Sequence, residues 1–184
     1  LPVLRVTTMS ESALDGLAAS ADSLRQESAV VLDLRGNGGG ADSPARAWCS
    51  RFTRQWFRWG CHSQVVPGEA APLRHWFSGS DHAYIHHGGD AAQEPYEGQL
   101  FVLIDTNVAS SGETFTLLSS QIEGAILVGE NTAGCMDYGN ADQHLKLPHS
   151  RFDLYFGRSR FVCQCVRPAA EGTGIFPDCW MDVE

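Results

Sequence analysis

The sequence predicts an α/β domain with a mostly parallel central sheet. Two segments, 28–34 (SAVVLDL) and 99–105 (QLFVLID), are almost continuously apolar and have an acidic residue close to their end. Such runs are typical of strands that are buried on both faces of a parallel sheet. A helix-like segment follows each run, and short strand-like segments dominate the last third of the chain. This order favours a parallel sheet flanked by helices, followed by a β-rich C-terminal part.

The first half of the chain is expected to contribute two strands and two helices. Residues 2–8 alternate like a half-buried strand. Ser10 then caps a helix, whose apolar face carries Leu14, Leu17 and Leu24. The buried strand at 28–34 leads through a glycine-rich loop into a second helix at about 43–57. The polar stretch 61–98 allows two short strands or an irregular excursion.

The second half returns to the alternation and then becomes rich in strands. The expected elements are, in chain order, a strand at 99–105, a helix at 110–124, a strand at 125–130, a loop at 131–142 and short strands at 144–148, 152–157 and 160–166. Phe115, Leu118 and Ile122 would form one face of the helix. The tail follows from residue 171.

The bulk composition describes one globular domain over residues 1–184. Hydrophobic residues make up 43% of the chain and charged residues 19%, which excludes a disordered chain. The formal net charge is −9, and Lys146 is the only lysine among 13 basic residues, so a nucleic-acid partner is not expected. No apolar run approaches the roughly 20 residues of a membrane span. Because the sequence starts directly in a strand without a methionine, we expect a fragment of a longer protein with an upstream region.

The cysteine content bears on the compartment of the protein. Six cysteines lack any CxxC pair and any Cys/His zinc spacing; they are Cys49, Cys61, Cys135, Cys163, Cys165 and Cys179. Two readings stay open: an exported protein with one or two disulfides, or buried free thiols. Export to the periplasm or the extracellular space is the localisation we expect.

A histidine-rich stretch at 81–90 (DHAYIHHGGD) raises the question of a metal site. His82 and His86 are four residues apart, which would suit zinc on a helix. The surrounding residues look more like a short strand or loop, where that spacing fails. We therefore expect no metal ligands here, and no metal or other cofactor in the protein.

The glycine-rich segment 33–40 (DLRGNGGG) follows a buried strand and opens toward a helix. Its backbone amides could bind an anion, but it is neither a GxGxxG nor a GK[ST] loop, so nucleotide binding is weakly supported. Glycine could instead let an amide approach a developing oxyanion. A tight strand-to-helix turn is the structural alternative, and the residues alone leave these open.

The segment 109–113 (ASSGE) stands where the second buried strand gives way to a helix. A serine at this place lies where open α/β sheets bind ligands, and a helix N-terminus favours negative charge. The alternative is that Ser110 or Ser111 is only a helix N-cap, with Glu113 completing a capping box.

The motifs taken together, in order, resemble those of the tail-specific, or C-terminal processing, serine peptidases and their tricorn-like relatives. These motifs are DLRGNGGG, the ASSGE elbow, GENTAG and the closing GIFPD, and they extend over nearly the whole chain. Each is moderately specific, whereas the ordered set is strong. The resemblance implies a core of the ClpP/crotonase type of α/β fold.

The resemblance implies a role for particular residues. Ser110, three residues before the glutamate, would be the nucleophile. The amide of Ser111 would form the oxyanion hole with a glycine amide, Gly39 in the first place and Gly40 next. Glu171, just before the closing motif, matches the acid of the tricorn-like Ser–His–Glu members. Glu113 would have a structural role.

The general base is where this chain departs from the family. The Ser–Lys members have a lysine where GENTAGC has Cys135, which we expect to be structural. Lys146 lies in a later strand that resembles a substrate-side strand and is not expected to act as the base. The histidine of the Ser–His–Glu members would lie upstream of this chain, because no histidine here is at a matching position.

The resemblance implies a serine-type peptidase that forms an acyl-enzyme on Ser110. Its partners would be a peptide or unfolded protein as substrate and the upstream domain of the same protein. A non-catalytic ligand- or peptide-binding module on the same fold is the alternative. A crotonase-like enzyme acting on thioesters is a third reading that rests on fold analogy alone.

Overall fold

The computed structural model describes residues 1–10, 16–54, 57–58, 60–65, 73–75, 86–87, 94–136, 138–139, 143–156, 159–163, 167 and 169–182. The histidine-rich stretch 81–90 therefore lies outside the described residues apart from 86–87. In the described part, no helix is long and apolar enough to cross a membrane.

Five parallel strands form the central sheet of the molecule. They are β1 (Val3–Arg5), β2 (Ala29–Asp33), β7 (Gln99–Ile104), β8 (Ile126–Gly129) and β15 (Cys179–Trp180), in the spatial order β1-β2-β7-β8-β15. Every pairing in this sheet is parallel. The prediction of a mostly parallel sheet from the apolar runs is therefore confirmed.

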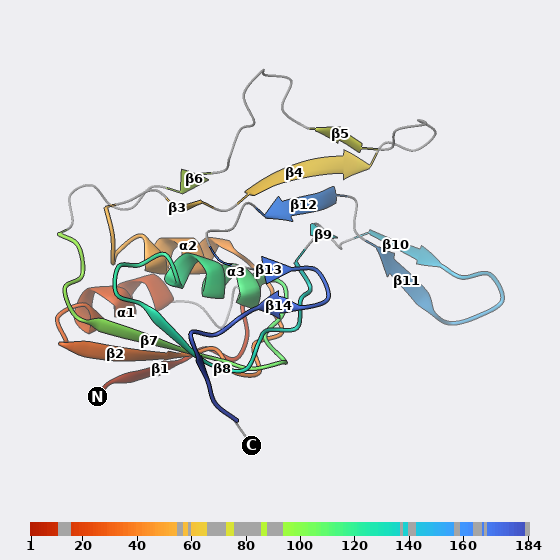
Figure 1. The fold of residues 1–184 in the computed structure, drawn as a ribbon. Helices are drawn as coiled ribbons and strands as arrows, with labels where there is room; N and C mark the ends of the chain where they lie inside the picture. The colour runs from red at the N-terminus through yellow and green to blue at the C-terminus, as the bar shows by residue number, and fades with distance from the viewer. Residues whose placement is uncertain are drawn as a thin grey trace.

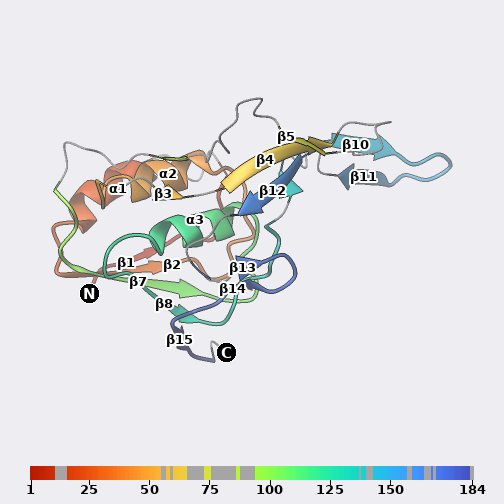
Figure 2. The same ribbon diagram turned by 45° about the horizontal axis from the view of Figure 1, so that its top comes forward.

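Three helices cover one face of the sheet (Figures 1 and 2). These are α1 (Leu17–Leu24), α2 (Ser43–Cys49) and α3 (Ser111–Ser119). Alternate residues of β2 and β7 are buried beneath them, among them Leu32 and Val102. The rings of Trp48 and Phe115 meet edge to face at 5.5 Å and join α2 to α3.

The second helix is shorter than the sequence predicted. It ends at Cys49 and not near residue 57. The chain turns there so that Phe52 packs on Trp48, with ring centroids 4.2 Å apart, and on Tyr96. Burial of these aromatic rings overrides the helical pattern, because each removes a large apolar area from water.

The other strands form small antiparallel sheets beside the core, which confirms the β-rich C-terminal part. β5 (Leu73–His75), β4 (Gly60–Val65), β12 (Ser159–Cys163) and β9 (Tyr138–Gly139) form one sheet in that order; β3 (Phe57–Arg58) pairs with β6 (His86–His87), β10 (Gln143–Lys146) with β11 (Asp153–Phe156), and β13 (Ala169–Ala170) with β14 (Gly174–Ile175). The pairing of β4 with β12 joins the polar excursion to the C-terminal strands.

The tail adds an edge strand to the central sheet, which the sequence did not predict. Asp178 anchors it, since its amide donates to the Leu127 carbonyl and its carboxylate accepts from the Leu127 amide. The Arg167 side chain donates to the same carboxylate, and this hydrogen bond lowers the pKa of Asp178.

Asp33 links the end of β2 to the glycine-rich loop. Its buried carboxylate accepts two hydrogen bonds of 2.8 Å from the Arg35 guanidinium. These bonds hold the pKa of Asp33 below its ordinary value. Because the folded-state pKa lies below the unfolded one, the stabilisation is present above about pH 4 and is lost as the pH falls through the folded-state pKa.

Asp33→Asn is therefore expected to lower the free energy of unfolding by about 1–3 kcal/mol at pH 7. The difference from the unmutated protein should shrink as the pH falls below about 4. Urea unfolding at both pH values measures it. The exposed Asp22, in α1, provides the control, because Asp22→Asn should change stability by less than about 0.5 kcal/mol. Equal effects of the two substitutions would contradict this role of Asp33.

Candidate active site

Ser110 occupies a sharp elbow between β7 and α3. Its backbone has φ 54° and ψ −122°, a conformation that non-glycine residues rarely adopt. Such strain costs about 1–3 kcal/mol and tends to occur at functional sites. Ser110 is also the N-cap residue of α3, so the nucleophile and cap readings of this serine are compatible.

The glycine-rich loop is docked against this elbow through Asn37. The side chain of the buried Asn37 makes two hydrogen bonds. Its oxygen accepts one from the Gly39 amide at 3.0 Å, and its nitrogen donates one to the Val6 carbonyl at 2.9 Å. Its backbone carbonyl accepts the amide of Ala109, the residue before Ser110, at 3.0 Å. One asparagine thus fixes the loop, the end of the first strand and the elbow relative to one another.

Gly39 lies directly against the two serines. A Cβ atom built at Gly39 would stand 2.8 Å from the Ser110 Cβ and 3.0 Å from the Ser111 amide nitrogen. The φ of Gly39 is +103°, which L-residues rarely adopt. The Ser111 hydroxyl donates to the Gly40 carbonyl at 2.8 Å. The structure therefore brings Ser110, Ser111, Gly39 and Gly40 together at the carboxyl edge of the sheet.

Two amides at this place have no acceptor among the described residues. Ser111 is the first residue of α3, where an N–H group has no intrahelical partner. Gly40 forms an isolated parallel bridge with Met9. The two hydrogen bonds of this bridge run from the Met9 amide to the Gly39 carbonyl and from the Ala41 amide to the Met9 carbonyl, so the Gly40 amide is not used in it. The Gly39 amide is already bonded to Asn37.

Glu113 is buried behind the elbow and accepts four hydrogen bonds. One carboxylate oxygen accepts from the Thr132 hydroxyl at 2.6 Å and the Gly134 amide at 2.9 Å. The other accepts from the amides of Ser110 and Cys135, at 3.1 and 2.8 Å. Burial raises the pKa of Glu113, and these four hydrogen bonds offset part of that effect. The carboxylate therefore ties the serine to the loop after β8, as expected of a structural glutamate.

Glu171 reaches the same loop from the turn between β13 and β14. Its carboxylate accepts the Met136 amide at 2.7 Å. The neighbouring Cys135 is half-buried and is a free thiol. Burial and the charges of Glu113 and Glu171 raise the pKa of this thiol. A thiol held neutral in this way cannot replace a lysine base.

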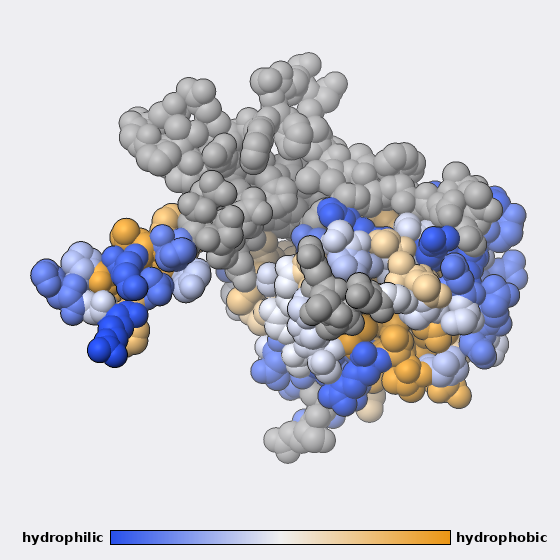
Figure 3. All heavy atoms as spheres, turned by 180° about the vertical axis from the view of Figure 1, so that it is seen from behind, coloured by the Kyte–Doolittle hydropathy of each residue, from blue (hydrophilic) through white to orange (hydrophobic). Residues whose placement is uncertain are grey.

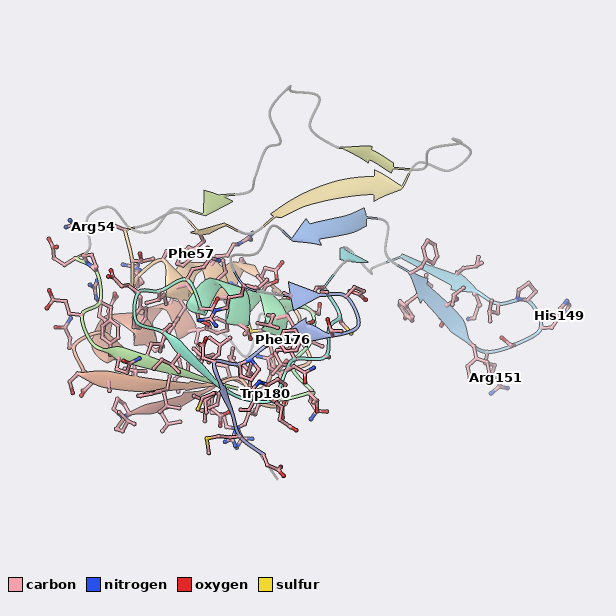
Figure 4. The ribbon with its side chains drawn as sticks, in the orientation of Figure 1. Arg54, Phe57, His149, Arg151, Phe176 and Trp180 are labelled. Carbon is pink, nitrogen blue, oxygen red and sulfur yellow. The ribbon has the colours of Figure 1, made fainter. Side chains whose placement is uncertain are left out.

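Lys146 and the described histidine side chains lie apart from this site. Lys146, His144 and His149 belong to the β10–β11 hairpin, which projects away from the sheet; Figure 4 shows His149 at its tip. Within the described residues, no histidine or lysine side chain is positioned beside Ser110. Cys49 and Cys179 are free thiols as well.

Asn37 and Thr132 hold the site together without having been assigned a role from the sequence. The buried Thr132 hydroxyl donates to Glu113 and accepts the Ile175 amide at 2.8 Å, which connects the elbow to β14. Asn37 lies in the motif DLRGNGGG and Thr132 in GENTAG, so the sequence motifs already contained both residues. The bonding partner of each could not be read from the sequence.

A strained serine at a strand-to-helix elbow, beside amides without acceptors, is the arrangement of α/β enzymes that use a serine nucleophile. A sequence model of peptidase family S41 matches residues 1–179. The chain belongs to this family. The match confirms the resemblance to the C-terminal processing peptidases that the ordered motifs indicated.

Known proteins agree with this assignment. The tail-specific protease of Haemophilus influenzae is 31% identical over 106 residues, which cover 58% of this chain and 13% of that protein. The photosystem II D1 C-terminal processing protease superposes with a TM-score of 0.65 at 17% identity, covering 98% of this chain and 42% of its own. Mature CPAF gives a TM-score of 0.71 at 14% identity, covering 97% and 46%. The solved structures share the fold, and the chain spans less than half the length of each of these proteins.

Proposed function

We propose that this chain is the catalytic core of a serine-type peptidase, with Ser110 as its nucleophile. The observation that carries the proposal is the strained Ser110 beside the amides of Ser111 and Gly40, which have no acceptor among the described residues. The serine oxygen attacks the peptide carbonyl carbon while its proton passes to a general base. The amine leaves with that proton and an acyl-enzyme remains. Water then releases the acid and regenerates the serine.

The amides around the serine would hold the negative charge that develops on the carbonyl oxygen. The Ser111 amide is one donor, supported by its place at the start of α3. Gly39 remains the first glycine candidate by its contact with Ser110, and it would have to release Asn37 to donate. Gly40 carries an amide without an acceptor among the described residues, which supports it as the alternative donor.

A histidine from a part of the protein outside this chain would supply the base. Glu171 would orient it, and a carboxylate would stabilise the imidazolium that forms. The proposal is supported by the hydrogen bond from Met136, one residue past Cys135, which directs Glu171 toward the loop that also binds the elbow. The negative charges of Glu113 and Glu171 make this place favourable for a cation.

The substrate would be an extended or unfolded polypeptide, held beside a strand edge by main-chain hydrogen bonds. The upstream domain of the same protein would be a further partner.

The elbow and glycine loop are both intact, which favours the peptidase over a binding module. We also propose export from the cytoplasm, tested by subcellular fractionation; its support is the cysteine count of the sequence alone, because the three described cysteines, Cys49, Cys135 and Cys179, are free thiols.

Two substitutions in the glycine-rich loop test this site. Gly39→Ala would place a methyl group against Ser110 and should lower hydrolysis of an unfolded protein substrate by about 100-fold or more. Gly38→Ala is the matched control, because a Cβ there meets nothing within 4 Å. It should retain activity within about threefold of the unmutated full-length protein. Equal rates for both variants would contradict the proposed oxyanion site.

A further inference from the structure

The β10–β11 hairpin has two chemically different faces. Its register pairs Leu145 with Leu154 and Lys146 with Asp153, and the Leu147 amide donates to the Phe152 carbonyl. Paired residues share a face in an antiparallel ribbon, and alternate residues change face. One face therefore carries the large apolar residues Leu145, Leu147, Phe152, Leu154 and Phe156, with Gln143 paired with Phe156 at its end. The other carries His144, Lys146, Asp153 and Tyr155.

The apolar face is exposed along its whole length. The exposed fractions are 55% for Leu145, 38% for Leu147, 74% for Phe152, 51% for Leu154 and 47% for Phe156. Figures 1 and 2 show the hairpin projecting away from the central sheet, and Figure 3 shows hydrophobic side chains at its surface. An isolated two-stranded hairpin is marginally stable in water, and a large exposed apolar patch is typical of an interaction site. The apolar face is therefore expected to bind another polypeptide surface.

The opposite face is already satisfied in water. Lys146 stands opposite Asp153, and the rings of His144 and Tyr155 lie 5.5 Å apart. Polar and charged groups there lose nothing by remaining solvated. The two faces therefore have the pattern of a ribbon that is covered on one side only.

We propose that the apolar face binds the same face of a second copy of this chain in a two-fold symmetric dimer. Each copy would bury on the order of 500 Å² of these side chains, so the pair would remove roughly 1,000 Å² from water, which is the least that a specific interface needs and corresponds to a weak dimer. A self-complementary patch suits two-fold symmetry, the commonest arrangement of homodimers.

Sedimentation velocity of the full-length protein tests the proposal. At high concentration the unmutated protein should have the sedimentation coefficient of a dimer. It should dissociate to monomers over about a hundredfold dilution. Leu154→Arg should weaken the dimer at least about tenfold. Tyr155→Arg is the matched control, because the adjacent residue is more exposed and lies on the other face; it should leave the dimer unchanged.

Phe152→Glu provides a second variant near the tip of the hairpin, where a folding defect of the core is not expected because the side chain is largely exposed. Circular dichroism of each variant checks that it is folded. An unmutated chain that stays monomeric at every concentration would overturn the proposal and leave the face to a different polypeptide. Equal weakening by Leu154→Arg and Tyr155→Arg would overturn it as well. The experiment does not depend on peptidase activity.

Discussion

Ser110→Ala is expected to lower peptide hydrolysis by the full-length protein by a factor of about 10⁴ or more. The loss follows because the neighbouring hydroxyl at the elbow, that of Ser111, is held in a hydrogen bond to the Gly40 carbonyl and does not replace the Ser110 hydroxyl. Stability should stay within about 1 kcal/mol of the unmutated protein, since the serine oxygen contributes little to the core. Initial rates with an unfolded protein substrate and a urea unfolding curve measure both effects.

Two companions of this variant separate chemistry from folding. Ser110→Gly should be equally inactive but more stable by about 1 kcal/mol, because glycine adopts the positive φ without strain. Ser120→Ala, at the far end of α3, should keep full activity. Persistent hydrolysis by Ser110→Ala would refute its role as the nucleophile.

Glu113→Ala is expected to be among the most destabilising substitutions in the chain. It removes the acceptor of four hydrogen bonds, and the amides of Ser110, Gly134 and Cys135 would be left without a partner. Each such group costs about 1–3 kcal/mol and the costs do not add fully, so we expect a loss of about 3–5 kcal/mol in the free energy of unfolding. Activity should fall with it, because the elbow loses its link to the loop after β8.

Glu113→Gln should fall between the alanine variant and the unmutated protein, since the amide keeps one acceptor oxygen but turns an NH₂ group toward donors. Glu123→Ala is the control for removing a glutamate, because Glu123 is exposed just beyond α3. Its effect should stay below about 0.5 kcal/mol. Urea unfolding of the three variants gives the comparison. A Glu113→Ala variant as stable as Glu123→Ala would show that the network has no structural role.

The central sheet could be predicted from the sequence because its strands are continuous apolar runs. The segments 28–34, 99–105 and 125–130 became β2, β7 and β8, and the helix after each of the first two was also foreseen. β15 was missed because it has two residues and carries no periodic pattern. The end of α2 was wrong because aromatic packing of Phe52 stopped a helix that the pattern continued.

The candidate site could be predicted only as a set of positions. The ordered motifs brought out Ser110, Ser111, Gly39 and Gly40, and the structure brings these four together. The left-handed φ of Ser110 and the four bonds to Glu113 depend on segments far apart in the chain. No local pattern encodes them. The role of Glu171 and the position of the base stay predictions.

The reaction of the full-length protein with a fluorophosphonate, mapped by mass spectrometry, tests the central claim most directly. A phosphonate ester should form on Ser110, and the adduct should be absent from Ser110→Ala. An adduct on Ser111, or no adduct on any serine of the intact, folded protein, would contradict the peptidase assignment of this elbow.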